Sequence, residues 1–278
     1  PSGATLSTGT HNADGSWSLT PAQLATVSIK PPSNFSGGFD LTLTAISTES
    51  RDGHPSASTS TPFHVSVDPV ADAGSIAGGG AGREDSWIPI TAHFSTPDTD
   101  GSEHWGATTT ISGVPAGAVL SQGTDLGGGA WQVSTTELAA GHVSIRPPAD
   151  SDADFSLHLS TTLTDTGNSH SDTRTITGDL PITVTAVADA PAITVADTHG
   201  AEDSSIALPG LSAALTDTDG SETLSVVISG VPAGASLSAG TALGNGAWQV
   251  AAGDLATLRM TPPRDFSGDI HLSLAATS

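Results

Sequence analysis

The carboxylates of this chain are concentrated in short acidic segments that occur twice. Of the six Glu, four fall in such segments, in two pairs about one repeat apart: Glu84 with Glu202, and Glu103 with Glu222. The recurring segments are Arg83-Glu84-Asp85-Ser86 with Ala201-Glu202-Asp203-Ser204, Asp98-Thr99-Asp100-Gly101-Ser102-Glu103 with Asp217-Thr218-Asp219-Gly220-Ser221-Glu222, and Asp72 with Asp189. Because Ca²⁺ takes roughly six to eight oxygen ligands from carboxylates, carbonyls and water, these segments indicate calcium. The ten His lack metal-ligand spacing, which disfavours Zn²⁺.

The alternative interpretation of these segments is turn chemistry combined with a solvated acidic surface, as in a salt-adapted protein. Repetition of all the segments together favours ion sites. An EF-hand does not fit, because Gly220 follows Asp217 by three positions and strands are expected on both sides. The glycine-rich segment 78–82 is suggestive of the RTX nonapeptide, but it does not iterate. Glu137 aligns with Asp254 and Gln23, so it is expected to be a plain surface residue.

Composition excludes several classes of function. The 278 residues hold 29 acidic and 7 basic side chains, a formal charge of 7 − 29 = −22, which excludes a nucleic-acid binder and attraction to anionic membranes. No apolar run reaches the roughly 20 residues that a membrane-inserted helix needs. There is no Cys for a disulfide, a thiolate site or a nucleophile. Pro1 is not a natural start, so we expect a window of a longer polypeptide.

The chain repeats itself at a spacing of about 117 residues. Val114–Ala118 returns as Val231–Ala235, and Gly129–Val133 returns as Gly246–Val250. A partial third copy lies at the start, where Asn34–Gly37 matches Asp265–Gly268. A unit of this length is a domain and not a solenoid repeat. The expected division is the back part of one domain over 1–70, a complete domain over 71–187, and a domain lacking its last strand over 188–278.

The predicted fold class is all-β, because short runs of Thr, Val, Ile and Ser alternate and are broken by Gly, Pro, Asp and Asn. Seven such runs in the complete unit predict an antiparallel β-sandwich of immunoglobulin-like type. The Trp that recurs at 17, 131 and 248 is expected to anchor each small core. The predicted strands are 88–94, 105–112, 118–121, 130–133, 142–146, 155–163 and 175–184.

Taken together, these segments resemble the tandem cadherin-like or bacterial Ig-like extender domains of giant RTX-type adhesins of Gram-negative bacteria. The resemblance is carried by Val187-Ala188-Asp189-Ala190-Pro191, Glu-Asp-Ser, Asp-Thr-Asp-Gly-Ser-Glu, Val-Pro-Ala-Gly-Ala and Pro-Pro-x-Asp-Phe-Ser-Gly. It implies cadherin-like sandwiches in an extended string with Ca²⁺ at the junctions. The implied ligands are Asp72, Glu84, Asp85, Asp98, Asp100 and Glu103 at one junction, and Asp189, Glu202, Asp203, Asp217, Asp219 and Glu222 at the next. Asp165, and Glu49 in the equivalent stretch, are expected to reach a junction from the preceding domain.

The resemblance implies an extracellular spacer on the bacterial cell surface, with calcium and the neighbouring domains of the chain as its partners. The adhesive ligand, a cell surface or glycan, would be bound elsewhere in the parent protein. The competing interpretation is a glycan- or protein-binding module that uses Trp87 or Trp105. An enzyme is not expected, because no Gly-x-Ser-x-Gly elbow occurs, and repetition of paired carboxylates in every unit is typical of structural ion sites and not of catalytic ones.

Overall fold

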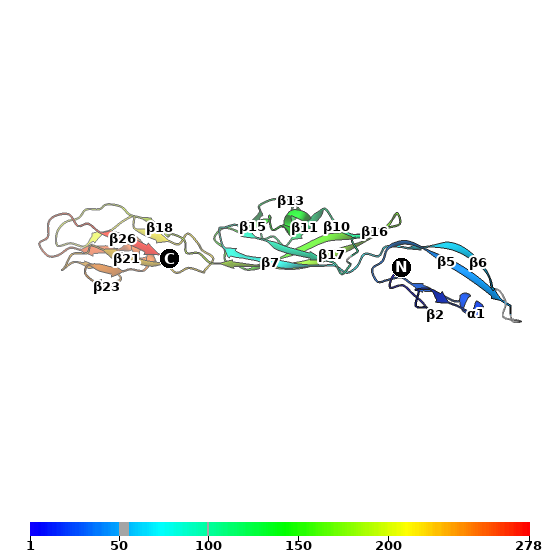
Figure 1. Ribbon diagram of the computed structural model, residues 1–278. Helices are drawn as coiled ribbons and strands as arrows, with labels where there is room; N and C mark the ends of the chain where they lie inside the picture. Colours follow the sequence, from blue (N-terminus) through cyan, green and yellow to red (C-terminus); the bar gives the residue numbers. More distant parts are fainter. Residues whose placement is uncertain (50–55, 99) are drawn as a thin grey trace.

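The computed structural model describes residues 1–49, 56–98 and 100–278, and it is built almost wholly of β-strands. Three consecutive parts of the chain follow one another along a single long axis (Figure 1). The first part contains strands β1 to β6, the middle part β7 to β17 and the last part β18 to β26 (Figure 1). The all-β class predicted from the alternating pattern is therefore confirmed.

The middle part contains an eight-stranded sheet and a three-stranded sheet. The larger sheet comprises β7 (Ser75–Arg83), β9 (Thr91–Ser95), β10 (Glu103–Trp105), β11 (Thr108–Ser112), β13 (Thr124–Gly127), β14 (Ala130–Ser134), β16 (Phe155–Gly167) and β17 (His170–Thr185). The smaller sheet comprises β8 (Ile88–Pro89), β12 (Val119–Leu120) and β15 (Ser144–Arg146). Pairing is antiparallel throughout except between β17 and β7, which run parallel.

One hydrophobic core joins the two sheets of the middle part. Ile88 and Ile145 come from the smaller sheet and Ile111 and Leu157 from the larger one, and all four are fully buried. Along β16 every second residue is buried, which is the alternation expected of a strand with one face on the core. Trp131 packs half-buried against this core, as predicted for it, whereas the prediction is wrong for Trp17, which belongs to neither core cluster.

The last part repeats this arrangement with fewer strands and has its own core, against which Trp248 packs. One sheet contains β21 (Ser225–Ser229), β23 (Thr241–Gly244), β24 (Ala247–Gln249) and β26 (Ser273–Thr277). A second contains β19 (Ile206–Ala207), β22 (Ser236–Leu237) and β25 (Arg259–Thr261), and β18 (Ala192–Thr194) pairs with β20 (Ser212–Ala214). A 3₁₀-helix spans Ala252–Thr257.

The first part consists of separate two-stranded sheets. Its largest element is the ribbon of β5 (Gly37–Thr48) and β6 (Ser56–Val67). The smaller pairs are β1 (Thr5–Leu6) with β4 (Ile29–Lys30) and β2 (Thr10–His11) with β3 (Trp17–Ser18). Among the described residues no buried hydrophobic side chain precedes Ala71, so this part has no core of its own.

All seven predicted strand regions contain strands, but two strands of the middle part, β7 and β13, were missed. The glycine-rich segment 78–82, considered above as an RTX-like loop, belongs to β7. Glycine is required here by close packing and not by a turn: a Cβ on Gly78, whose φ is 151°, would lie 1.9 Å from the carbonyl oxygen of Thr91. The region 88–94 is divided into β8 and β9, and 105–112 is interrupted between β10 and β11.

Two single-turn helices, α1 (Pro21–Leu24) and α2 (Thr135–Ala139), were not predicted. Ser134 caps α2 by accepting a hydrogen bond from the backbone N–H of Glu137. Thr20 caps α1 in a reciprocal box with Gln23. Glu137 and Gln23 thus occupy the same position of equivalent helices, where either a carboxylate or an amide serves, and this explains why the charge there is lost between copies.

Equivalent leucines in the middle and first parts provide a matched test of this fold. Leu159 is 1% exposed, whereas Leu43, at the same position of the β5–β6 ribbon, is 42% exposed. We predict that Leu159→Ala lowers the free energy of unfolding by about 2–5 kcal/mol, because it leaves a cavity in a closed core. Leu43→Ala should cost less than about 1 kcal/mol. Guanidinium denaturation followed by Trp fluorescence measures both, and equal costs would contradict the assignment of a core to the middle part alone.

Candidate metal sites

The first acidic cluster lies where the first and middle parts meet. Asp72, Asp98 and Glu103 each offer a carboxylate oxygen, and these oxygens all lie within 4.8 Å of one another. Asp72 belongs to the connecting segment, and its backbone N–H donates a 2.6 Å hydrogen bond to Oε1 of Glu103. Asp165, on β16, accepts a 3.0 Å hydrogen bond from the N–H of Val70. The connecting segment is thus held by carboxylates of the part that follows it.

The loop that carries Asp98 and Asp100 is closed by hydrogen bonds to their own carboxylates. The N–H of Asp100 donates to Oδ1 of Asp98 at 2.9 Å, and the N–H of Ser102 donates to Oδ1 of Asp100 at 2.8 Å. Gly101 has a φ of 88°, which a side chain would resist. These bonds orient Asp98 towards the cluster and use Asp100 to close the loop. Thr99 lies outside the described residues.

The second acidic cluster, between the middle and last parts, is larger. It contains three overlapping groups of carboxylate oxygens, each within 4.8 Å. The groups are Glu84 with Asp217 and Asp219, Asp85 with Asp150 and Asp189, and Asp189 with Asp217 and Glu222. Asp152 adds an eighth carboxylate, because its N–H donates to Oδ2 of Asp219 at 3.3 Å. Every one of the three groups contains a residue of the last part or of its linker.

Backbone contacts repeat from one cluster to the other. The N–H of Asp189 donates a 2.5 Å hydrogen bond to Oε1 of Glu222, as Asp72 does to Glu103. Ser221 closes the loop between Asp217 and Glu222 in the same way as Ser102. From the other side, Oε1 of Glu84 accepts a 2.5 Å hydrogen bond from the N–H of Val187. The second linker is therefore held by carboxylates from both of the parts that it joins.

Four buried carboxylate oxygens in the two clusters have no hydrogen-bond partner: Oδ1 of Asp165, Oε2 of Glu84, Oδ2 of Asp189 and Oε2 of Glu222. No Lys or Arg forms an ion pair with these carboxylates in residues 1–49, 56–98 and 100–278. An ionised oxygen buried without a partner is costly, and each such group in a native structure requires an explanation. A bound cation would supply the missing partner.

Burial raises the pKa of several of these carboxyls. For Glu84, 2% exposed, burial raises the pKa, and the charges of Asp217 and Asp219 add to the effect. Burial followed by the charge of Glu103 raises the pKa of Asp72, and burial followed by Asp85 raises that of Asp189. A raised pKa is expected when carboxylates lie close to one another in a site from which water is partly excluded.

The two loop-closing aspartates behave in the opposite way. Hydrogen bonds from Ser102 lower the pKa of Asp100, and those from Ser221 lower the pKa of Asp219. These two carboxylates therefore stay ionised to a lower pH than an ordinary Asp side chain does.

The predicted grouping of ligands is corrected in two respects. Glu84 and Asp85 do not lie with Asp72, because β7 carries them to the opposite end of the middle part, where they meet Asp189 and Asp217. Glu202 and Asp203 are likewise removed from Asp189: they are exposed, and Asp203 accepts a hydrogen bond from the N–H of Asp265. That contact is equivalent to the one from Asp150 to Asp85, so this pair marks the far end of the last part.

Asp165 was expected at the junction that follows its own domain, but it lies at the junction that precedes it. The reason is that β16 runs towards the first part and places Asp165 against Val70. Glu49, in the equivalent stretch, is exposed at the end of β5, away from both clusters. Asp98, Asp100 and Glu103, and Asp217, Asp219 and Glu222, lie at the junctions predicted for them.

Sequence reasoning missed Asp150, Asp152 and Asp172. Asp150 could have been found, because the Pro-Pro-x-Asp segment recurs as Pro-Pro-x-Asn and Pro-Pro-x-Asp, and all three residues have a positive φ (Asn34, Asp150 and Asp265). Asp152 stands where the other copies have Ser36 and Ser267, so repetition gave no signal. Asp172 accepts the N–H of Ala71 at 2.9 Å only because the β16–β17 hairpin reaches the linker.

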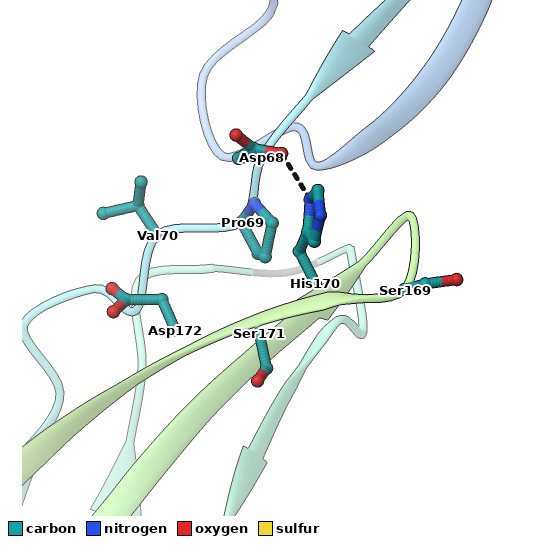
Figure 2. A pocket seen from close by; sticks show the side chains of 7 residues that line it. All are labelled: Asp68, Pro69, Val70, Ser169, His170, Ser171 and Asp172. Carbon is teal, nitrogen blue, oxygen red and sulfur yellow. Dashed lines mark hydrogen bonds and ion pairs between the residues drawn. The ribbon is translucent and has the colours of Figure 1, made fainter.

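That hairpin also borders a shallow hollow at the first junction (Figure 2). His170 forms a 2.7 Å contact from Nδ1 to Oδ1 of Asp68, and Asn168 donates to Oγ of Ser66 at 2.9 Å. Both contacts join the middle part to the end of β6 and the residue that follows it. The hollow is open to solvent and is lined by the linker itself, so it is a joint between parts and not an enclosed ligand pocket.

The donor set fits a hard divalent cation. All the candidate ligands are oxygens, several are buried without a partner, and they converge from different elements, which suits Ca²⁺ better than metals that prefer nitrogen or sulfur. No His or Cys belongs to any of the groups found among the described residues. The eight carboxylates of the second cluster are enough oxygen ligands for more than one cation.

Comparison with known proteins adds little. No protein-family profile matches the sequence, and no curated protein is significantly similar to it. Among solved structures, a variant of the endo-fucoidan hydrolase MfFcnA4 from glycoside hydrolase family 107 aligns at 16% identity and a TM-score of 0.17. The alignment covers 99% of this chain and 35% of that chain. Separately, none of the described helices is long and apolar enough to cross a bilayer.

The raised pKa values predict how metal-free stability depends on pH. A carboxyl whose pKa is higher in the folded chain binds its proton there first, so the free energy of unfolding rises as the pH falls towards that pKa. In EDTA we expect the melting temperature to rise as the pH falls from 7 towards the ordinary carboxyl pKa values of 3.8 and 4.5, because Asp72, Glu84 and Asp189 take up protons in the folded chain first. Below the ordinary Asp value of 3.8 the trend should reverse as Asp100 and Asp219 lose their hydrogen-bonded charge. Scanning calorimetry in EDTA measures this, and a fall between pH 7 and 5 would contradict it.

Proposed function

We infer that this chain is a structural extender: a string of Ig-like, cadherin-like β-sandwich domains, divided near residues 70 and 187, whose junctions are stiffened by Ca²⁺. The observation that carries the proposal is the second acidic cluster, where ionisable oxygens from two consecutive parts converge and three of them are buried without partners. Two sheets around one core in the middle part support the sandwich assignment. The single axis along which the parts lie suits a spacer (Figure 1).

The residues have separate tasks in this proposal. Glu84 and Asp85 would hold the ion from the middle part, and Asp217, Asp219 and Glu222 from the last part. Asp189 lies between them on the linker. When bound, calcium supplies positive charge that cancels the mutual repulsion of these groups and couples the two parts, so its binding free energy adds to stability and stiffness. At the first junction Asp72, Asp98, Glu103 and Asp165 would act together.

The cellular setting follows from the resemblance to RTX-type adhesins. We propose that the chain lies outside the cell on a bacterial surface, with calcium and its own neighbouring domains as partners. An unbranched, cysteine-free string suits export and a role in projecting a distant binding domain away from the cell. Bound metal ions would then supply the cross-links between segments that disulfides supply in many other exported proteins.

The alternative, a glycan- or protein-binding module, now depends on one residue. Trp105 packs on Phe94, with ring centroids 5.3 Å apart, and contributes to the core. Trp87 is 48% exposed, and the guanidinium of Arg146 lies 5.7 Å from its ring centroid. A glycan array probed with the wild-type chain and with Trp87→Ala separates the two functions, since a spacer retains no sugar with either.

The proposal predicts a calcium response that depends on the cluster. A ligand present at 100 times its Kd stabilises by about 2.7 kcal/mol, which is about 10 °C in melting temperature for a domain of this size. We expect Ca²⁺ to give a rise of this order over EDTA, with a smaller rise for Mg²⁺. Glu84→Gln and Asp217→Asn should remove most of the rise.

Glu137→Gln is the matched control, because Glu137 is an acidic residue of the middle part that bonds His142, away from the junctions. It should keep the full calcium response. A chain whose melting temperature is the same in EDTA and in calcium would overturn the proposal, and the acidic clusters would then be solvated surface.

A further inference from the structure

The larger sheet of the middle part has an outer face that is almost free of charge. Along β16 every second residue is buried in the core, and the residues between them point to the opposite, solvent-facing side of the sheet. The register of the neighbouring strands continues this side across five strands, in the order β13-β14-β11-β16-β17. One row of it consists of Thr124, Gln132, Thr110, Ser160 and Thr177. We call the solvent-facing side of these five strands the hydroxyl face.

Ser and Thr dominate the hydroxyl face. The outward positions of β16 are all Ser or Thr except His158. The positions opposite them on β17 are Ser or Thr except Asp179 and Pro181. Asp179 is the only acidic residue at the outward positions of β11, β14, β16 and β17, all of which the structure describes, and its Oδ1 contacts Nδ1 of His158. Almost all of the 29 acidic side chains of the chain therefore lie elsewhere.

The corresponding strands of the other two parts follow the same pattern. On the β5–β6 ribbon, the side that carries Thr44 has Asp40 as its only acidic residue among the described positions, and Nδ1 of His64 lies 2.8 Å from Oδ1 of this Asp. On β21, β24 and β26, the positions that alternate with the buried Val226 and Ile228, and those paired with them, carry no charged residue. Acidic residues are thus kept off the same face in all three parts, and where one occurs a His accompanies it.

The chemistry of this face suits a second copy of the same chain. A hydroxyl group both donates and accepts hydrogen bonds, so a surface of hydroxyls is complementary to an identical surface, whereas a surface of carboxylates is not. With a formal charge of −22, two copies repel one another, and the hydroxyl face is where they can approach without placing like charges together. A sugar fits less well, because ligand sites are lined largely by hydrophobic and aromatic side chains. The outward positions of β11, β14, β16 and β17 carry no Phe or Trp, since Trp131 and Phe155 pack against the core.

The size of the face agrees with a weak contact between two copies. β16 is 13 residues long, and β17 pairs with it along its whole length. At about 3.3 Å per residue and about 4.8 Å between strands, the five strands give of the order of 600 Å² per copy. Two copies would bury about 1,200 Å², which is the lower end of specific protein–protein interfaces. We propose that the hydroxyl face of one copy packs on the hydroxyl face of a second copy across a two-fold axis, a contact that does not require calcium at the junctions.

Light scattering at increasing protein concentration measures this association. The mass should rise from the 27.5 kDa of one chain towards twice that value. Thr177→Glu should weaken association by about tenfold or more, since each copy would bring a carboxylate into the interface. Thr136→Glu is the matched control, because it adds the same charge at an exposed position of α2, whose Leu138 packs on the core side of the sheet. It should change association by less than about twofold, since its charge is screened by salt. A mass of one chain at all concentrations, or equal effects of the two variants, contradicts the proposal.

Cross-linking locates the contact without adding a charge, because the chain has no Cys of its own. The single variants Ser112→Cys, Thr173→Cys and Thr177→Cys place a thiol at different positions along the hydroxyl face, so that one of them lies near the two-fold axis. Treated with a short bismaleimide, at least one of these chains should form covalent dimers, whereas Thr136→Cys should not. If none of the three forms dimers, or if Thr136→Cys forms them in equal yield, the hydroxyl face is not the contact and the proposal is overturned.

Discussion

Mutual repulsion of carboxylates at the junctions is the constraint on which the rest of this molecule depends. Eight acidic side chains crowd the second junction, two of them (Glu84 and Asp217) buried, and no Lys or Arg of the described residues pairs with them. Such a site is unfavourable while its members stay ionised and unpartnered. The small cores on either side contribute nothing to relieve it. A cation shared between the two parts, as proposed above, would relieve this repulsion and would also fix the orientation of one part relative to the other.

The linkers show how this constraint reaches the backbone. Both place an Asp whose N–H is bound by a Glu of the loop that follows, Glu103 for Asp72 and Glu222 for Asp189. The same glutamates contribute to the groups of candidate ligands. Each of these glutamates is both a candidate metal ligand and the acceptor of a linker N–H, so binding of an ion to it would also restrain the backbone of the linker. On the proposed function, the acidic clusters would therefore set the orientation of the parts.

Much of this arrangement could be predicted from the sequence. Alternation located the strands, and repetition located the acidic segments, because both are local patterns. What failed was long-range: the sequence could not tell that β7 carries Glu84 away from Asp72, or that β16 returns Asp165 to the preceding junction. The glycine-rich segment around Gly78 was misread as a loop. Gly78 is needed because the backbone of Thr91 on the neighbouring strand lies too close for a side chain, and no local pattern in the sequence reveals that contact. Asp152 stands where the other copies have Ser, and Asp172 reaches the linker only through the β16–β17 hairpin, so repetition marked neither residue.

The most direct test of the central claim is the spread of distances across the second junction. Because the chain has no native Cys, two spin labels can be attached to one chain that carries both Ala140→Cys, in the middle part, and Thr241→Cys, in the last part. Both positions are exposed. Double electron–electron resonance then measures the distance distribution between them. We predict a broad distribution in EDTA that narrows to a single peak in calcium, with Glu84→Gln remaining broad. An equally wide distribution with and without calcium would contradict the claim that the acidic clusters control the junction.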